Sequence, residues 1–272
     1  MSAKTQTKSK FDELINLYLE NIIGRTTNDG SLEFEVRFGT KGSKISYIDY
    51  TNVVRNLLSS NFKSSDPTDF LRINCEYNDP KTGVTKISNI RSEIGGLGNI
   101  SKYCSTDSIL DSTGSAFCTF EQKSFMRSDD GIAIYPLDFE DFNFRASVQI
   151  EKKFHQGAGI VRSIIDKWKD SKKTFRLINR TTLKHDKYPV KVDISIVRSS
   201  RTKGRNMVPE YRFTNSGVLE SNQIYEIEIE IDNTKVGPGT EFNSKEAVGN
   251  AIRKVIKLIM SGIQSTNYPV SY

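Results

Sequence analysis

The sequence predicts an α+β fold that is mostly β: a closed antiparallel sheet of about eight strands with a charged interior and a few flanking helices. Three observations predict it. Residues 31–40 alternate charged and apolar side chains, residues 225–232 do so again near the other end, and most strands between them carry their charges on one parity. If the charged faces point inward, the outer apolar faces need cover, which the helices can supply.

The first and last strands carry the strongest signal. Residues 31–40 place Glu33, Glu35 and Arg37 on one face and apolar residues on the other, while residues 225–232 place three glutamates on one face. These three are Glu226, Glu228 and Glu230. Carboxylates stacked on one strand face repel one another unless they are solvated or meet cations. The wide separation of the two strands suits a closed sheet in which they meet.

The other elements follow from apolar periodicity. Helices are expected at residues 9–24, 49–58 and 160–169 and from residue 243 onward, with Ser9 and Asn243 as caps and Gly24 as a stop. Strands are expected at residues 70–77, 87–93, 118–127, 144–154, 174–183 and 189–197, and residues 95–114 are expected to form a loop. The predicted divisions are an N-terminal tail and packing helix (1–30), the closed-sheet domain with its C-terminal helix (31–262) and a C-terminal linker (263–272).

Composition excludes several classes of protein. A net charge of +6, from 39 basic and 33 acidic residues, fits a polyanion held at a local site better than a general nucleic-acid coat. Three widely spaced cysteines favour a reducing compartment, cytoplasmic or nuclear, and no Cys or His pair has zinc spacing. The sequence shows no secretory signal and no apolar run that could span a membrane, so it predicts a protein that is neither secreted nor membrane-bound.

The charged strand faces predict a particular chemistry. An ordinary half-buried sheet explains the alternation of any single strand, but it does not explain two strands of stacked acids among several strands that carry Arg or Lys. Facing one another across a lumen, the carboxylates could hold a metal ion and the basic side chains could hold a phosphate chain.

Two motifs carry a resemblance to a known family. Glu-Phe-Glu-Val-Arg-Phe-Gly at 33–39 together with Glu-Ile-Glu-Ile-Glu at 226–230 resembles the metal-dependent RNA 5′-triphosphatases of the triphosphate tunnel metalloenzyme superfamily. These enzymes serve mRNA capping in fungi, protozoa and large DNA viruses, and the resemblance runs from Leu32 to the end. It implies an eight-stranded tunnel that takes the 5′-triphosphate end of nascent RNA, removes the γ-phosphate and leaves a 5′-diphosphate.

The end of the chain adds an expectation about partners. Residues 263–271 are similar to the end of this domain in giant-virus capping enzymes, where a guanylyltransferase domain follows. The resemblance therefore implies a viral N-terminal module working with a guanylyltransferase in cis or in trans. For a viral protein the expected location is the virion or a cytoplasmic viral factory.

The resemblance also assigns roles by position. Glu33, Glu35, Glu228 and Glu230 would hold Mg²⁺ or Mn²⁺. Arg180, Glu151 and Asp193 would complete the catalytic set. Substrate phosphates would be bound by Arg37, Arg91, Lys123, Arg145, Arg176, Arg180, Lys191 and Arg198. Two positions depart from the family: Ile178 stands where a phosphate-binding lysine is expected, and Arg198 needs a bulge to face inward.

Three alternatives remain open at this stage. A sister hydrolase would act on thiamine triphosphate, inorganic tripolyphosphate or free nucleoside triphosphates, or would cyclise nucleotides, but such relatives typically show Glu-x-Glu-x-Lys in the first strand. A non-catalytic module that binds RNA 5′ ends would keep the tunnel without turnover, and Ile178 keeps this reading open. A structural β domain would leave the charged faces solvated.

Overall fold

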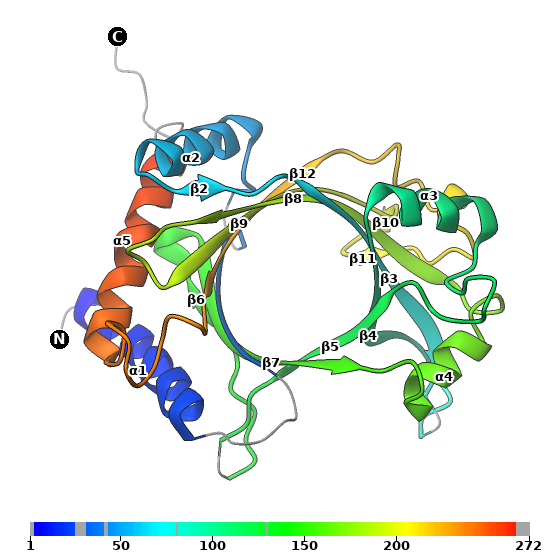
Figure 1. Cartoon of the computed structure of the whole chain (residues 1–272), viewed down its shortest axis with the longest axis horizontal. Helices are drawn as coiled ribbons and strands as arrows, with labels where there is room; N and C mark the ends of the chain where they lie inside the picture. The colour runs from blue at the N-terminus through cyan, green and yellow to red at the C-terminus, as the bar shows by residue number, and fades with distance from the viewer. Residues whose placement is uncertain (1–2, 25–30, 41–42, 80, 129, 265–272) are drawn as a thin grey trace.

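A closed β-barrel forms the centre of the computed structural model, which describes residues 3–24, 31–40, 43–79, 81–128 and 130–264. Eight strands pair antiparallel in the order β1-β12-β9-β8-β3-β4-β5-β7, and β7 pairs back onto β1 (Figure 1). They are β1 (Ser31–Phe38), β3 (Thr68–Asn78), β4 (Thr85–Gly95), β5 (Thr119–Phe125), β7 (Phe144–Phe154), β8 (Lys173–Lys184), β9 (Val190–Ser199) and β12 (Ile224–Ile231). The predicted eight-stranded closed sheet is confirmed.

Short strands and 3₁₀ turns lie beside the eight strands of the barrel. The strand β2 (Lys63–Ser64) pairs with β8, β6 (Leu137–Phe139) pairs with β7, and β10 (Thr202–Lys203) pairs with β11 (Asn206–Met207). Single 3₁₀ turns occur at Glu140–Phe142 and Phe213–Asn215.

The first and last strands of the barrel lie side by side, as predicted. Glu35 of β1 is directly opposite Glu230 of β12, and Arg37 is opposite Glu228. Directly paired residues of an antiparallel sheet point to the same face, so the two acidic strands present their charges together.

Helices cover the outer face of the barrel in two groups (Figure 1). The first group is α1 (Ala3–Gly24), α2 (Tyr47–Ser59) and α5 (Lys245–Gln264), and the second is α3 (Leu97–Thr106) and α4 (Gly159–Asp166). Under the first group, the outward residues of β1 and β12, such as Phe34 and Ile229, share a core with Tyr18 and Ile252. The other group closes a second core around Trp168. None of the helices in the described residues is both long enough and apolar enough to cross a membrane.

Several element boundaries differ from the predictions. Helix α1 begins at Ala3, ahead of the expected cap Ser9, and ends at Gly24 as predicted. Helix α5 is capped by Ser244, whose Oγ accepts from the Ala247 N–H at 3.2 Å, and not by Asn243. This helix continues past residue 262 to Gln264, so it crosses the predicted start of the linker. Residues 1–2 and 25–30 of the predicted tail and 265–272 of the linker lie outside the described residues.

The helix α3 lies inside the segment that the sequence predicts as a loop. It starts after Gly96, which has φ +83° and no side-chain cap, and it buries only Ile100 and Tyr103. Two buried residues one turn apart, behind a pair of glycines, give too weak a helical pattern to detect from sequence.

Candidate active site

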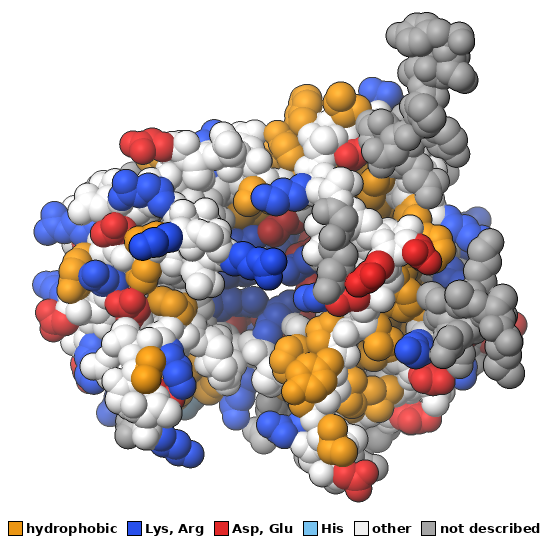
Figure 2. Space-filling model, turned by 180° about the vertical axis from the view of Figure 1, so that it is seen from behind, with side chains coloured by type: hydrophobic (Ala, Val, Ile, Leu, Met, Phe, Trp, Pro, Cys, Tyr) orange, Lys and Arg blue, Asp and Glu red, His pale blue; other side chains and the backbone are white. Residues whose placement is uncertain are grey.

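The barrel encloses a charged cavity of about 540 Å³, which is the size of an ordinary ligand site. Its basic lining residues are Arg37, Arg72, Arg91, Lys123, Arg145, Arg176, Arg180 and Lys191. Its acidic lining residues are Glu33, Glu35, Glu93, Glu121, Glu151, Glu228 and Glu230. Figure 2 shows Lys and Arg side chains gathered around the opening on one face. The charged strand faces therefore point inward.

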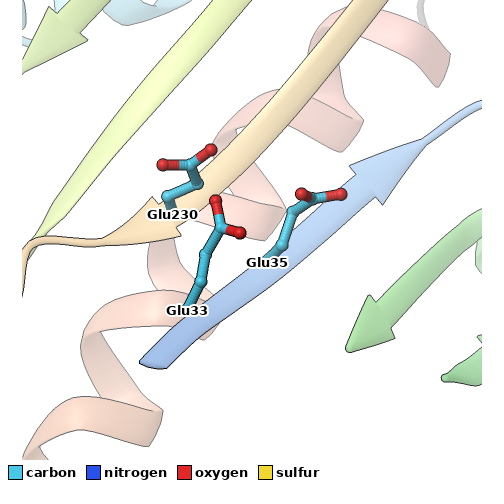
Figure 3. A group of neighbouring side chains, drawn as sticks. All are labelled: Glu33, Glu35 and Glu230. Carbon is cyan, nitrogen blue, oxygen red and sulfur yellow. The ribbon is translucent and has the colours of Figure 1, made fainter. Parts of the chain in front are cut away.

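Three carboxylates converge at one place on this wall. Glu33 and Glu35 alternate along β1, and Glu230 lies opposite Glu35 on β12, so one oxygen of each lies within 4.8 Å of the others (Figure 3). Glu33 Oε2 is buried and makes no hydrogen bond among the described residues, although Lys123 Nζ lies 2.6 Å away. Carboxylate oxygens in this arrangement fit Mg²⁺ or Mn²⁺, and a bound cation would satisfy the buried oxygen.

Within the acidic group, the pKa values of Glu33 and Glu230 are shifted in opposite directions. Burial and the neighbouring Glu230 raise the pKa of Glu33 to about 8. Burial also acts to raise the pKa of Glu230, but Lys191, with Nζ 2.5 Å from Oε2, and the hydrogen bond with Glu33 bring it down to about 2. Without a metal, burial and mutual repulsion therefore favour one proton shared by this pair of carboxylates.

Metal binding at this group is expected to release that proton. Because Glu33 must ionise to act as a ligand, apparent metal affinity should rise about tenfold per pH unit below pH 8 and level off above it. The raised pKa also means that the contribution of Glu33 to the stability of the metal-free protein falls as pH rises from 4.5 to about 8, since at this group the folded state binds more protons than the unfolded state. Calorimetric titration with Mn²⁺ in buffers of different ionisation enthalpy measures the released proton. A pH-independent affinity between pH 6 and 8 would contradict the assignment.

Glu228, the fourth predicted metal ligand, lies outside this group of three carboxylates. It is buried, with Oε1 2.5 Å from Arg37 Nη2 and Oε2 3.7 Å from Arg180 Nη2. Burial acts to raise the pKa of Glu228, but Arg37 and Arg180 together hold it below its usual value. This carboxylate therefore stays ionised without a metal.

Most of the predicted phosphate-binding residues lie on the cavity wall in ion pairs. Arg91 Nη2 lies 2.9 Å from Glu121 Oε2 and 2.7 Å from Glu151 Oε1, so one guanidinium bridges β5 and β7. Arg176 Nη2 lies 2.6 Å from Glu226 Oε1, so this glutamate orients the guanidinium. A phosphate group entering the tunnel would replace these carboxylates as the acceptor of hydrogen bonds from N–H donors that are already positioned.

Two predicted positions need correction. Arg198 does not face the cavity: β8 and β9 pair without a bulge there, and its Nη1 donates to the carbonyls of Leu219 and Ser221. Asp193 points to the inner face, opposite Glu228, but it is buried beneath Arg180, whose Nη1 lies 3.1 Å from Asp193 Oδ2. Asp193 therefore positions Arg180 and does not reach the cavity itself.

The fully buried Ile178 has an apolar environment on the inner face of the barrel. It lies between Arg176 and Arg180 on the same parity, and it is opposite Phe70 on one side and Val197 on the other. The cross-strand neighbours of Ile178 on the inner face are therefore apolar, while Arg176 and Arg180 flank it along β8.

Three charged lining residues, Arg72, Glu93 and Glu121, were absent from the predicted site. Arg72 Nη2 binds Glu93 Oε2 at 2.7 Å and adds a cation on β3, next to Arg176 on β8. The sequence pattern does predict an inward position for Arg72, since it alternates with the apolar Leu71 and Ile73 as the other tunnel residues do with their neighbours.

Comparisons with known proteins show that the chain shares a known fold. No protein-family model matches the chain, and no curated protein matches it by sequence. The chain is similar in structure to the RNA triphosphatase domain of a trifunctional mimivirus mRNA capping enzyme, with a TM-score of 0.55 and 15% identity over 95% of this chain and 99% of that one. It is also similar to an S. pombe RNA triphosphatase, with a TM-score of 0.51 and 12% identity over 93% and 92% of the two chains. The chain has their tunnel fold. At these identities the likeness concerns the fold, and the activity depends on the chain's own residues.

Proposed function

We propose that this chain is a metal-dependent RNA 5′-triphosphatase, which hydrolyses the bond to the γ-phosphate and leaves a 5′-diphosphate end. The proposal is carried by the convergence of Glu33, Glu35 and Glu230 within 4.8 Å, in a tunnel whose wall bears eight basic side chains. A divalent cation and a chain of phosphates are the ligands that such a wall would bind together. The fold shared with two RNA triphosphatases supports the same activity.

The charge balance of the wall links metal to substrate. With every side chain ionised, the eight basic and seven acidic residues leave a single positive charge in excess. A divalent cation on the carboxylates would raise that excess to about three, closer to the charge of a triphosphate. We therefore expect metal and triphosphate to bind cooperatively.

The chain's residues divide the work of phosphoryl transfer. Glu33, Glu35 and Glu230 would hold the ion, which supplies a Lewis acid for a phosphate oxygen when bound. Guanidinium groups such as those of Arg91 and Arg176 would grip phosphate oxygens and stabilise the charge that shifts toward the leaving group. Positioning and charge neutralisation account for most of the catalysis in such a reaction.

We assign orientation of the attacking water to Glu228. Its carboxylate is ionised and shares one face of β12 with Glu230, so it lies beside the acidic group. Glu228 accepts a hydrogen bond from the water and orients it, and the water proton leaves to solvent as the water oxygen bonds to the γ-phosphorus. The bond from the γ-phosphorus to the bridging oxygen breaks, and its electron pair stays on the β-phosphate.

Phosphate release from 5′-triphosphate RNA tests this function. Release is expected with Mg²⁺ or Mn²⁺, is expected to stop with EDTA, and is expected to be absent from a Glu35→Ala variant that remains folded by circular dichroism. A folded wild-type protein that binds RNA without releasing phosphate would be a non-catalytic 5′-end module. A protein that prefers tripolyphosphate, thiamine triphosphate or free nucleoside triphosphates to RNA would be a sister hydrolase of the same fold.

The product of the proposed reaction defines the next step. A 5′-diphosphate RNA end is the acceptor for transfer of a guanylyl group, so the proposed partner is a guanylyltransferase in cis or in trans. The mimivirus neighbour is itself a domain of a trifunctional capping enzyme. The proposed location is the compartment where transcripts are made, the nucleus or a cytoplasmic viral factory.

A further inference from the structure

An exposed aromatic pair lies at the rim of the tunnel. The Phe125 and Tyr135 rings have centroids 5.4 Å apart, and their side chains are 42% and 67% exposed. They stand at the base of a hairpin that continues β5 beyond the barrel wall, in which Arg127 bridges to Ala133 (Figure 1). Two large aromatic side chains in contact and open to solvent are a recurrent sign of a binding surface.

Phe125 connects this pair to the proposed metal group. It lines the tunnel cavity and shares a face of β5 with Lys123, about 7 Å away along the strand. Lys123 Nζ in turn lies 2.6 Å from Glu33 and 3.1 Å from Glu35. A substrate whose terminal phosphate reaches the carboxylates would therefore extend past Lys123 toward the Phe125 ring.

A second groove, of about 530 Å³, adjoins the tunnel at this rim, and Lys123 and Phe125 line both. Asn89, Gln149 and Arg127 also line the groove. In the part of the chain that the structure describes, none of its lining residues is acidic, in contrast to the tunnel. An aromatic face, side-chain amides and cations without acids suit a nucleoside with its adjoining phosphates.

We propose that Phe125 and Tyr135 form the platform on which the 5′-terminal nucleobase of the RNA stacks while its triphosphate enters the tunnel. This inference rests on the proposed function. It adds a binding site for the nucleobase, whereas the tunnel itself binds the triphosphate. Stacking tolerates any base, because every base has a π-face, so the platform selects nucleotides over inorganic polyphosphates and does not select a sequence. Figure 2 shows hydrophobic side chains gathered beside the opening on the face drawn there.

The test compares equilibrium binding of two non-hydrolysable ligands in the presence of Mg²⁺. One is a short RNA with a 5′-imidotriphosphate, and the other is inorganic imidotriphosphate. For the Phe125→Leu variant the affinity for the RNA ligand is expected to fall about 5- to 100-fold relative to that for the inorganic ligand. Phe125→Trp keeps a stacking surface and is expected to retain the wild-type preference. Phe142→Leu is the matched control, since Phe142 is also 42% exposed but lines neither cavity.

Each outcome decides the inference. An unchanged preference in Phe125→Leu, or an equal loss for both ligands, would overturn the platform. A loss that Phe142→Leu reproduces would overturn it as well, because any exposed aromatic residue would then have the same effect. Because binding is measured without turnover, a protein that hydrolyses no RNA but shows the Phe125-dependent preference would refute the proposed function and keep the platform.

Discussion

Glu230→Gln is expected to weaken metal binding and to lower metal-dependent phosphate release by on the order of 10²–10³-fold. The substitution keeps the shape of the side chain and an oxygen that can accept from Lys191, which now lies 2.5 Å away. It removes one of three carboxylates whose oxygens lie within 4.8 Å, so two remain to hold the ion. It also removes the negative charge that helps to raise the pKa of Glu33, so that pKa should fall.

Glu93→Gln is the matched control for this prediction. Glu93 lines the same cavity and binds Arg72 at 2.7 Å, but it does not belong to the group of three carboxylates. Its loss should leave the affinity for Mn²⁺ unchanged, whatever it does to substrate binding. Calorimetry on both variants measures that affinity directly. Equal weakening in the two variants would mean that the wall binds metal diffusely, and normal affinity in Glu230→Gln would remove this residue from the ligand set.

Much of the fold was predictable from residues that repeat with a period of two. The glutamates of β1 and β12 could not all face the apolar layer beneath the helices, so the alternation fixed which face is interior and suggested that these strands meet. The register between them was not predictable: pairing Glu35 with Glu230 decides which carboxylates converge, and it places Glu228 beside Arg37. Register arises from packing across strands far apart in sequence, which alternation within one strand does not encode.

The individual errors have local causes. Arg198 was included in the site on family position, but its parity places it on the outer face, where loop carbonyls bind it. Asp193 has the right parity yet is buried behind Arg180, a depth that sequence does not reveal. The aromatic pair of Phe125 and Tyr135 was also invisible, because the two residues meet only through the hairpin that joins β5 to β6.

Arg180→Met is expected to stop phosphate release and also to lower the free energy of unfolding by about 3 kcal/mol. Asp193 is buried, and burial raises its pKa while Arg180, with Nη1 3.1 Å from Oδ2, opposes that effect. Without the guanidinium, the carboxylate still accepts from the Thr182 hydroxyl, which donates to Oδ1 at 2.6 Å. A buried charge left without its counterion is costly, so the single variant should be unstable as well as inactive.

Adding Asp193→Asn to that variant separates the two effects. The asparagine carries no charge and its oxygen can still accept from Thr182, so most of the lost stability should return, as urea unfolding would measure. Phosphate release should stay lost, because Arg180 itself lines the tunnel and Asp193 does not. A double variant as unstable as Arg180→Met would show that Arg180 stabilises the barrel through other contacts, such as Glu228. Restored activity would instead show that Arg180 does not grip the substrate, and that its loss acted only through the buried carboxylate.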